Sequence, residues 1–384
     1  MSLVYSEEQR LLADTAREFL AARSPVAAQR RLRDDKAPLG FDAALWREMV
    51  ELGWSAIPFP EEQGGLDFGC QSLGAVFEQL GRNLSASPLL SSVVLGGSLL
   101  QLAGSSAQQA HWLPALIGGE KRLALAIDER GRHDPLATSL RAERSADGFR
   151  LSGDKLFVVD GLQADAYLVV ARTAGQSGEE SGLSLLLVEA NTPGLTVSPA
   201  ALIDSRNCAR LHFDGVVVPV DALVGELDNG LVVLEQALDR GRVCLAAELL
   251  GAAQQLFETT LDYLKTRVQF DAPIGSFQAL QHRAARLYVE LALARSAVMG
   301  GLAALDDASL SAAERGRLAS LAKWKAGVAA DKVSNEAVQL HGGIGVTDEL
   351  DVGLFLKRIR VAQACLGDSD YHCQRYGALS DAQV

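Results

Sequence analysis

The order in which hydrophobic periods follow one another constrains the fold more than any other feature of this chain. Apolar residues recur at helical spacing up to about residue 120, short β-type runs occupy about 121–225, and helical spacing returns from about 226 to 384. Strands and helices therefore do not alternate, which argues against a βαβ architecture. The pattern predicts an α+β multidomain protein with an N-terminal helical domain (1–120), a β-barrel-like middle domain (121–225) and a C-terminal helical bundle of the four-helix type (226–384).

Local signals mark the ends of several expected helices. Ser6 and Gln9 form an S-x-x-Q capping box, in which each side chain satisfies a free backbone N–H at a helix start. Ser311 and Glu314 repeat this arrangement ahead of a long helix that we expect to reach the glycine pair at 342–343. These boundaries support helical outer parts.

The middle part carries strand signals. Asp147-Gly148 predicts a hairpin turn, because this dipeptide tolerates the left-handed backbone of tight turns. Leucine-rich and β-branched runs predict strands at 123–127, 167–171, 183–188 and 216–218.

Composition excludes several classes of protein. The formal net charge of −12 argues against a general nucleic-acid partner, which requires a basic face. Five cysteines form no C-x-x-C pair, so we expect reduced thiols and no metal site. The N-terminus resembles no signal peptide, and the longest apolar runs are too short to span a bilayer. The chain is therefore expected to be cytoplasmic, with no membrane span.

Common catalytic motifs are absent from the sequence. No G-x-G-x-x-G follows a predicted strand, and the glycine cluster at 342–345 follows a helix, where a cap and turn are the usual structure. No G-x-S-x-G elbow is present, and the six histidines are scattered. Neither a Rossmann dinucleotide site nor an α/β-hydrolase triad is predicted.

Three separated segments together resemble acyl-CoA dehydrogenases. Residues 267–278 (RVQFDAPIGSFQ) resemble the second flavin-side motif of that family, residues 339–345 (QLHGGIG) resemble the third, and residues 60–65 (PEEQGG) resemble its N-terminal loop. The segments keep the family's order and spacing over essentially the whole chain. The resemblance implies a helical, β, helical fold that binds FAD between the β-domain and the C-terminal helices, with a neighbouring subunit completing the adenine and pyrophosphate end.

The resemblance also implies roles for individual residues. Arg267 would face the pyrophosphate, since a fork of fixed donors suits phosphate oxygens. Phe270 and Phe277 would pack near the adenosine, or alternatively form plain interface core, and Gln278 would offer amide hydrogen bonds. The third motif would bring backbone close to the cofactor at Gln339, Gly342 and Gly343.

The flavin-facing part of the chain departs from the family pattern. The first motif, usually T-E-P-G-A-G-S-D, corresponds to residues 127–134. This stretch begins at Ile127 and lacks Ser and Thr. Phe157 stands where the family usually has tryptophan beside the flavin, and the hydroxyl two residues later is lost. Ile127 and Phe157 remain the expected flavin-side residues.

The proton-abstracting base is the largest departure. Members of the family carry a glutamate at one of two positions, and the matching residues here are Gly241 and Gly367. Glu248, inside an apolar run, and Asp368, next to Gly367, are the candidate bases. A helix-surface acid at Glu248 and a turn residue at Asp368 are the structural alternatives.

The pattern is most similar to small subunits of heteromeric acyl-CoA dehydrogenases, such as those of pimeloyl-CoA dehydrogenase. It implies FAD-dependent conversion of an acyl-CoA to a 2-enoyl-CoA, with an electron-transferring flavoprotein as the acceptor. A homo-oligomer or a heterotetramer with a larger homologous chain is expected. The alternatives are a catalytically silent subunit that completes a partner's flavin site, and a flavin monooxygenase or acyl-CoA oxidase on the same fold.

Overall fold

The computed structural model describes residues 4–145 and 147–381. The chain divides into two compact units. The helical unit comprises Met1–Arg31, Cys70–Ser85 and Arg242–Val384, and the sheet unit comprises Leu32–Gly69 and Ala86–Gly241.

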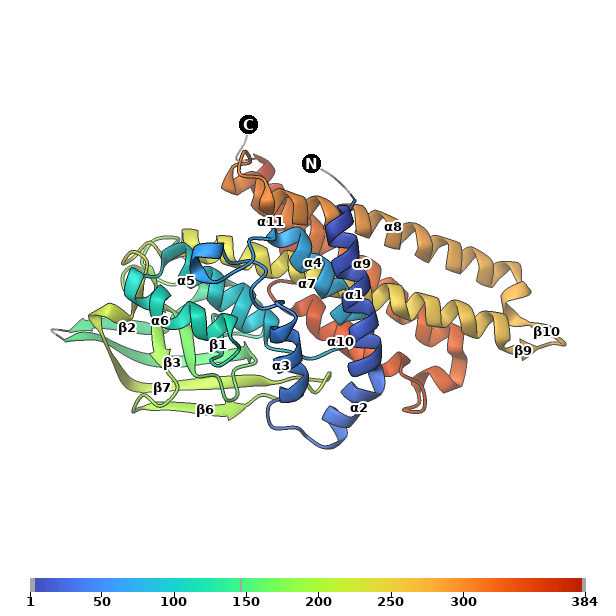
Figure 1. Ribbon diagram of the computed structural model, residues 1–384, viewed down its shortest axis with the longest axis horizontal. Helices are drawn as coiled ribbons and strands as arrows, with labels where there is room; N and C mark the ends of the chain where they lie inside the picture. The colour runs from blue at the N-terminus through green and yellow to red at the C-terminus, as the bar shows by residue number, and fades with distance from the viewer. Residues whose placement is uncertain (1–3, 146, 382–384) are drawn as a thin grey trace. The chain divides into compact units, whose positions relative to one another are not determined.

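Long helices build the helical unit. In chain order, its elements are α1 (Glu7–Arg23), α4 (Gly69–Asn83), α7 (Gly230–Thr266, which starts in the sheet unit), β9 (Val268–Gln269), β10 (Ala272–Pro273), α8 (Gln278–Asp306), α9 (Ala312–His341), α10 (Val352–Ala364) and α11 (Ser369–Asp381). Helix α2 (Val26–Asp34) follows α1. The α8 and α9 helices pack side by side, and the β9–β10 hairpin connects α7 to α8 (Figure 1).

Glycines allow α4 and α7 to cross at backbone contact. A Cβ atom added at Gly81 would lie 2.0 Å from the Glu248 carbonyl oxygen, and one added at Gly251 would lie 1.9 Å from the Glu78 carbonyl oxygen. Any larger residue at either position would push the two helices apart.

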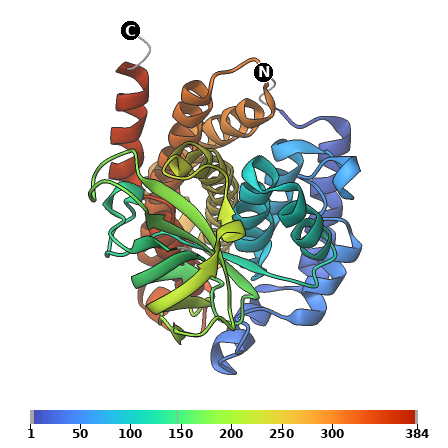
Figure 2. The ribbon, with the colours of Figure 1, turned by 90° about the vertical axis from the view of Figure 1, so that its left-hand side faces the viewer.

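A mixed β-sheet forms the centre of the sheet unit (Figure 2). The strands are β1 (Leu123–Ala126), β2 (Arg141–Ser145), β3 (Gly148–Val159), β4 (Ala166–Arg172), β5 (Leu183–Glu189), β6 (Leu195–Pro199), β7 (Cys208–Pro219) and β8 (Leu223–Val224). They follow the order β6-β7-β3-β2-β4-β5-β8, and β1 pairs in parallel with β4. The sheet unit also contains α3 (Ala43–Glu51), η2 (Leu89–Gly97), α5 (Ser98–Ala103) and α6 (Ser106–Ile117), and the short 3-10 helices η1 (Glu61–Gln63), η3 (Pro135–Ala137) and η4 (Val220–Ala222).

The sheet encloses a continuous apolar core. Leu151, Tyr167, Leu186 and Phe213 are each almost fully buried in it. Alternation in β3 and β7 turns every second side chain inward, as a sheet with one solvated face requires.

The predicted α+β fold is confirmed, and so are its local signals. Both capping boxes form, at the starts of α1 and α9, and Gly342 follows the end of α9. Three of the four expected strands lie within observed strands, the fourth (123–127) extends one residue beyond β1, and β2 and β3 meet at the expected hairpin. Strands β2 and β3 flank the expected hairpin turn, whereas β6 was not predicted. The boundaries of the three-part division stay a prediction.

In the described part of the chain, one helix, α8, has the length and apolar composition to cross a membrane, and half of its apolar window is buried. A core helix packed inside a protein meets the same criterion, and α8 packs along α9.

Candidate functional site

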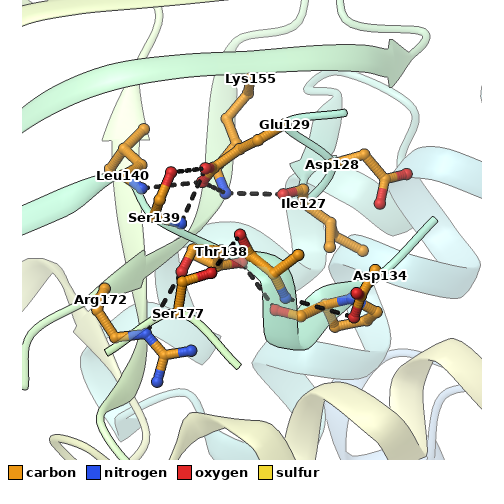
Figure 3. Close-up of polar contacts among 12 residues, drawn as sticks. Ile127, Asp128, Glu129, Asp134, Thr138, Ser139, Leu140, Lys155, Arg172 and Ser177 are labelled. Carbon is orange, nitrogen blue, oxygen red and sulfur yellow. Dashed lines mark hydrogen bonds and ion pairs between the residues drawn. The ribbon is translucent and has the colours of Figure 1, made fainter. Parts of the chain in front are cut away.

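A buried lysine holds together the segment that corresponds to the first flavin-side motif (Figure 3). Lys155, in β3, is fully buried, and its Nζ donates to the Ile127 carbonyl oxygen at 2.7 Å and to Glu129 Oε1 at 2.8 Å. The Glu129 carboxylate also accepts from the backbone N–H groups of Ser139 (2.8 Å) and Leu140 (3.0 Å). One carboxylate therefore joins both ends of the loop between residues 129 and 139.

The surroundings of this pair favour the charged form of Glu129 and disfavour the charged form of Lys155. Burial raises the pKa of Glu129, but Lys155 and the hydrogen bonds from Ser139 and Leu140 lower it more, so the net shift is downward. Burial lowers the pKa of Lys155, and the nearby carboxylate offsets this only in part.

A second buried cation supports the same loop from its other side. Arg172, in β4, is 1% exposed and donates to the backbone carbonyls of Leu136 (3.1 Å), Thr138 (3.4 Å), Glu179 (3.0 Å) and Ser181 (2.7 Å). Burial lowers the pKa of this guanidinium. The arginine thus ties the first-motif loop to the turn that follows β4.

Phe157 is turned outward by a β-bulge. The register between β3 and β7 shifts between Lys155 and Val158, and Phe157 has a φ of +54°, an unusual backbone for an aromatic residue. Its side chain is 42% exposed, whereas Lys155 and Val158 are buried. Bulges of this kind re-aim a side chain and concentrate at functional sites.

The predicted second-motif residues lie between the end of α7 and the first residue of α8. Arg267, Phe270, Phe277 and Gln278 are all exposed. Phe270, with φ +53°, is 88% exposed, and its ring lies 6.0 Å from that of Phe277 at an edge-to-face angle of 82°. Two adjacent exposed aromatic rings form a ready surface for a ligand or a partner chain.

The structure brings the second and third motifs together. The Tyr263 ring stacks on His341 (centroids 4.3 Å apart, 29° between planes), and its hydroxyl donates to the His341 carbonyl oxygen at 3.3 Å. Arg267 follows Tyr263 by one helical turn, with its N–H bonded to the Tyr263 carbonyl, and Gly342 follows His341 directly. The ends of α7 and α9 thereby place both motifs in one region of the helical unit.

The glycine pair of the third motif is exposed and open. Gly342 has φ +66° and donates its N–H to the Gln339 carbonyl oxygen. A Cβ atom added at Gly342 or Gly343 would meet no atom within 4 Å. A ligand can therefore approach the backbone there without obstruction.

The space beside Gly367, one of the two positions where family members carry the base, is filled by neighbouring side chains. Gly367 has φ +105°, and a Cβ atom there would lie 2.4 Å from Tyr371 Cδ1 and 2.8 Å from His372 Nε2. Lys323, fully buried on α9, donates to the Gln363 and Gly367 carbonyl oxygens at 2.9 and 3.0 Å. A glutamate at 367 would need this packing to be rebuilt.

Cationic and neutral groups surround the Gly367 turn. Burial lowers the pKa of Lys323 to about 8 and strongly depresses the pKa of His372. Arg242, also fully buried, donates to the Leu366 carbonyl oxygen at 3.4 Å and to the Tyr371 hydroxyl at 3.1 Å. These side chains were not predicted from the sequence.

The two candidate bases are both engaged in structural contacts. Glu248 is buried as expected, but the Arg358 guanidinium contacts both of its oxygens, Nε to Oε1 at 2.7 Å and Nη2 to Oε2 at 3.0 Å. The expectation of a lone acid among apolar side chains is therefore wrong. Asp368 accepts from the Tyr371 backbone N–H at 2.9 Å at the start of α11, which is a helix-capping contact. Their catalytic assignment stays a prediction.

Comparison with known proteins identifies the family. Residues 6–120 match the acyl-CoA dehydrogenase N-terminal domain, 126–216 the middle domain and 228–378 the C-terminal domain. The chain is 31% identical to acyl-CoA dehydrogenase FadE27 of Mycobacterium tuberculosis, over 89% of each chain. The chain belongs to the acyl-CoA dehydrogenase family.

Two solved structures have the same fold as this chain. Butyryl-CoA dehydrogenase from Megasphaera elsdenii superposes with a TM-score of 0.88 at 25% identity, over 98% of this chain and 99% of that one. A chain of the ChsE4–ChsE5 complex from Mycobacterium tuberculosis gives 0.88 at 29% identity, with both chains fully covered.

FAD is the cofactor of acyl-CoA dehydrogenases, and the residues present fit it. The outward-turned Phe157 lies in the sheet unit, and the exposed aromatic pair with the open glycine backbone lies in the helical unit. Such surfaces suit a ligand with a ring system and a pyrophosphate. Among the described residues, no cluster of three His, Cys, Asp or Glu side chains could hold a metal ion.

Proposed function

We propose that this chain takes part in FAD-dependent α,β-desaturation of an acyl-CoA thioester, which yields a 2-enoyl-CoA. The observation that carries the proposal is the Tyr263–His341 stack, which gathers the second and third flavin-side motifs into one region. FAD, when bound, supplies the acceptor for the substrate's β-hydride. In this proposal Ile127 and Phe157 of one chain would lie beside the flavin. Arg267 at the pyrophosphate and Phe270 and Phe277 at the adenosine would serve the FAD that a neighbouring subunit shares.

The test begins with the purified protein. Its absorption spectrum should show bound flavin after FAD is added, and anaerobic addition of straight-chain, dicarboxylic or steroid side-chain acyl-CoA esters should bleach that flavin. A protein that stays colourless with FAD, alone and with a homologous partner chain, would exclude the proposal.

A catalytically silent subunit is the second candidate. Two features support it: no carboxylate stands at position 241 or 367, and the space beside Gly367 is filled by Tyr371 and His372. In addition, Glu248, the candidate base on α7, is already paired with Arg358. In this case a larger homologous chain would supply the base, as proposed for small subunits of heteromeric members.

The two candidates give different results in one experiment. A chain with its own base should reduce its flavin with an acyl-CoA when purified alone. A silent subunit should do so only in a complex with a larger homologous chain. Rapid oxidation of the reduced flavin by O₂ would instead favour the acyl-CoA oxidase or monooxygenase alternative.

The exposed apolar surface of α8 and the preceding hairpin supports oligomer formation with a second copy or a homologous chain. Its members are Val268, Phe270, Phe277, Tyr288, Val289 and Leu293. A closed dimer or tetramer would cover these exposed side chains. Light scattering of the wild type against Phe270→Ser tests this, since loss of the exposed ring should weaken assembly. We further propose an electron-transferring flavoprotein as the electron acceptor and the cytoplasm as the location.

A further inference from the structure

We propose that Lys155 is a positioning residue that fixes the flavin-facing segment 127–140 and the bulged Phe157 in one arrangement. This inference rests on the proposed FAD-dependent function. Lys155 and Arg172 lie outside the family motifs quoted for this chain, and Glu129 lies in the first motif, where no partner was predicted for it.

Burying the Lys155 ammonium group is unfavourable unless the fold gains something from its contacts. An ammonium group removed from water costs several kcal/mol unless it is paired and hydrogen-bonded. Lys155 is fully buried, and its two contacts, the Ile127 carbonyl oxygen and the Glu129 carboxylate, both belong to the segment after β1. A leucine or valine would fill the same inward-facing strand position without that cost.

The Lys155 contacts act on the segment as a clamp. Glu129, held by Lys155, accepts hydrogen bonds from Ser139 and Leu140, so the two ends of the loop cannot separate without breaking charge-assisted bonds (Figure 3). Arg172 fixes the carbonyl groups of Leu136 and Thr138 in the same loop. The glycine and arginines at 130–132 lie exposed between the clamped ends.

The same lysine also anchors the start of the bulge. Lys155 and Val158 point inward on either side of the register shift, which forces the Phe157 ring outward. If Lys155 loses its contacts, the strand can return to regular alternation, and Phe157 then turns toward the interior. The flavin-side backbone at 127 and the aromatic ring at 157 are therefore set by one side chain.

The test compares Lys155→Met with the wild type and with Lys357→Met, an exposed lysine on α10. In the apo-protein, trypsin should cleave after Arg130 or Arg132 about tenfold faster in Lys155→Met, because the clamp has lost its charge-assisted contact. In the FAD-loaded protein, release of FAD should also quicken by about tenfold, and the flavin absorption envelope should change. Lys357→Met should match the wild type in all three measurements.

A milder variant keeps the inference testable if Lys155→Met does not fold. Ser139→Ala removes one donor to Glu129 at an exposed position and should shift cleavage and FAD release in the same direction by a smaller factor. Faster cleavage with unchanged FAD release and spectrum would overturn the positioning role and leave only a structural one. Wild-type cleavage in both variants would overturn the clamp itself. Failure of the wild type to bind FAD would refute the proposed function, and the protease measurement would still decide on the clamp.

Discussion

Replacing Glu248 by glutamine separates a structural acid from a catalytic base. Glu248 and Arg358 face each other with their side chains 6% and 12% exposed. Two hydrogen bonds of 2.7 and 3.0 Å join them in the bidentate geometry typical of strong carboxylate–guanidinium pairs. The substitution keeps the shape of the side chain and removes its charge.

The magnitude follows from the burial of the pair. Removing one partner of a buried ion pair costs about 3 to 5 kcal/mol, because the remaining charge loses its counter-ion. Glutamine keeps one oxygen that can accept from Arg358 Nε, so we expect the lower end, about 3 kcal/mol. That loss should lower the thermal midpoint by several degrees.

The assay is thermal and urea unfolding of Glu248→Gln beside a matched control on the same helix. Glu258 pairs with Arg82, but its side chain is 42% exposed, so Glu258→Gln should cost under about 1 kcal/mol. Replacing Glu248 and Arg358 together by methionine should recover most of the lost stability, since both charges leave at once.

The opposite pattern would refute this reasoning. If Glu248→Gln unfolds like the wild type, the ion pair contributes nothing measurable. If that variant also binds FAD normally and its flavin is no longer reduced by acyl-CoA, Glu248 is the base after all.

Three further predictions concern the packed turn and the helix starts. Gly367→Ala should destabilise the protein by about 1 to 3 kcal/mol in a urea titration, because its Cβ would lie 2.4 Å from Tyr371 Cδ1 at φ +105°. The control is Gly377→Ala, in open space on α11, which should be neutral or slightly stabilising. Burial lowers the pKa of Lys323 from its ordinary value of 10.5 to about 8 in the folded protein. The folded protein therefore binds this proton less tightly than the unfolded chain does. The contribution of Lys323 to stability rises with pH across that window, and Lys323→Met should remove this rise when midpoints are compared at the two ends of the window. Ser311→Ala should cost about 1 kcal/mol by removing the cap of α9, and circular dichroism during thermal unfolding would show no change if the cap is unimportant.

Local chemistry made much of the fold predictable from the sequence. The capping boxes at Ser6 and Ser311 fix helix starts because each satisfies its own backbone donors within four residues. Short apolar runs at 123–127 and 183–188 predict buried strands, and the structure buries them in the sheet unit. Strand β6 was not predicted because its alternation of Leu195, Thr196 and Val197 is short and ends at a proline.

The candidate site was predictable only where a motif is continuous. Residues 267–278 and 339–345 could be recognised as motifs, but their proximity depends on Tyr263 stacking on His341, 78 residues apart in sequence. Lys155 left one signal: it shares the parity of the buried Phe149 and Leu151 along β3, which places a lysine on the inward face.

The sequence by itself determined the order of helical and strand-rich parts and which family motifs are present, because both depend on neighbouring residues. Only the tertiary structure decided what the charged residues do. Glu248 fits an apolar run in sequence, yet Arg358, 110 residues away, neutralises it. A glycine at 367 is compatible with an empty base position, yet Tyr371, His372 and Lys323 fill and bind that turn. The energy of a buried charge is set by the groups that the fold brings within about 4 Å of it. That distance cannot be predicted from the number of residues that separate two groups in the sequence.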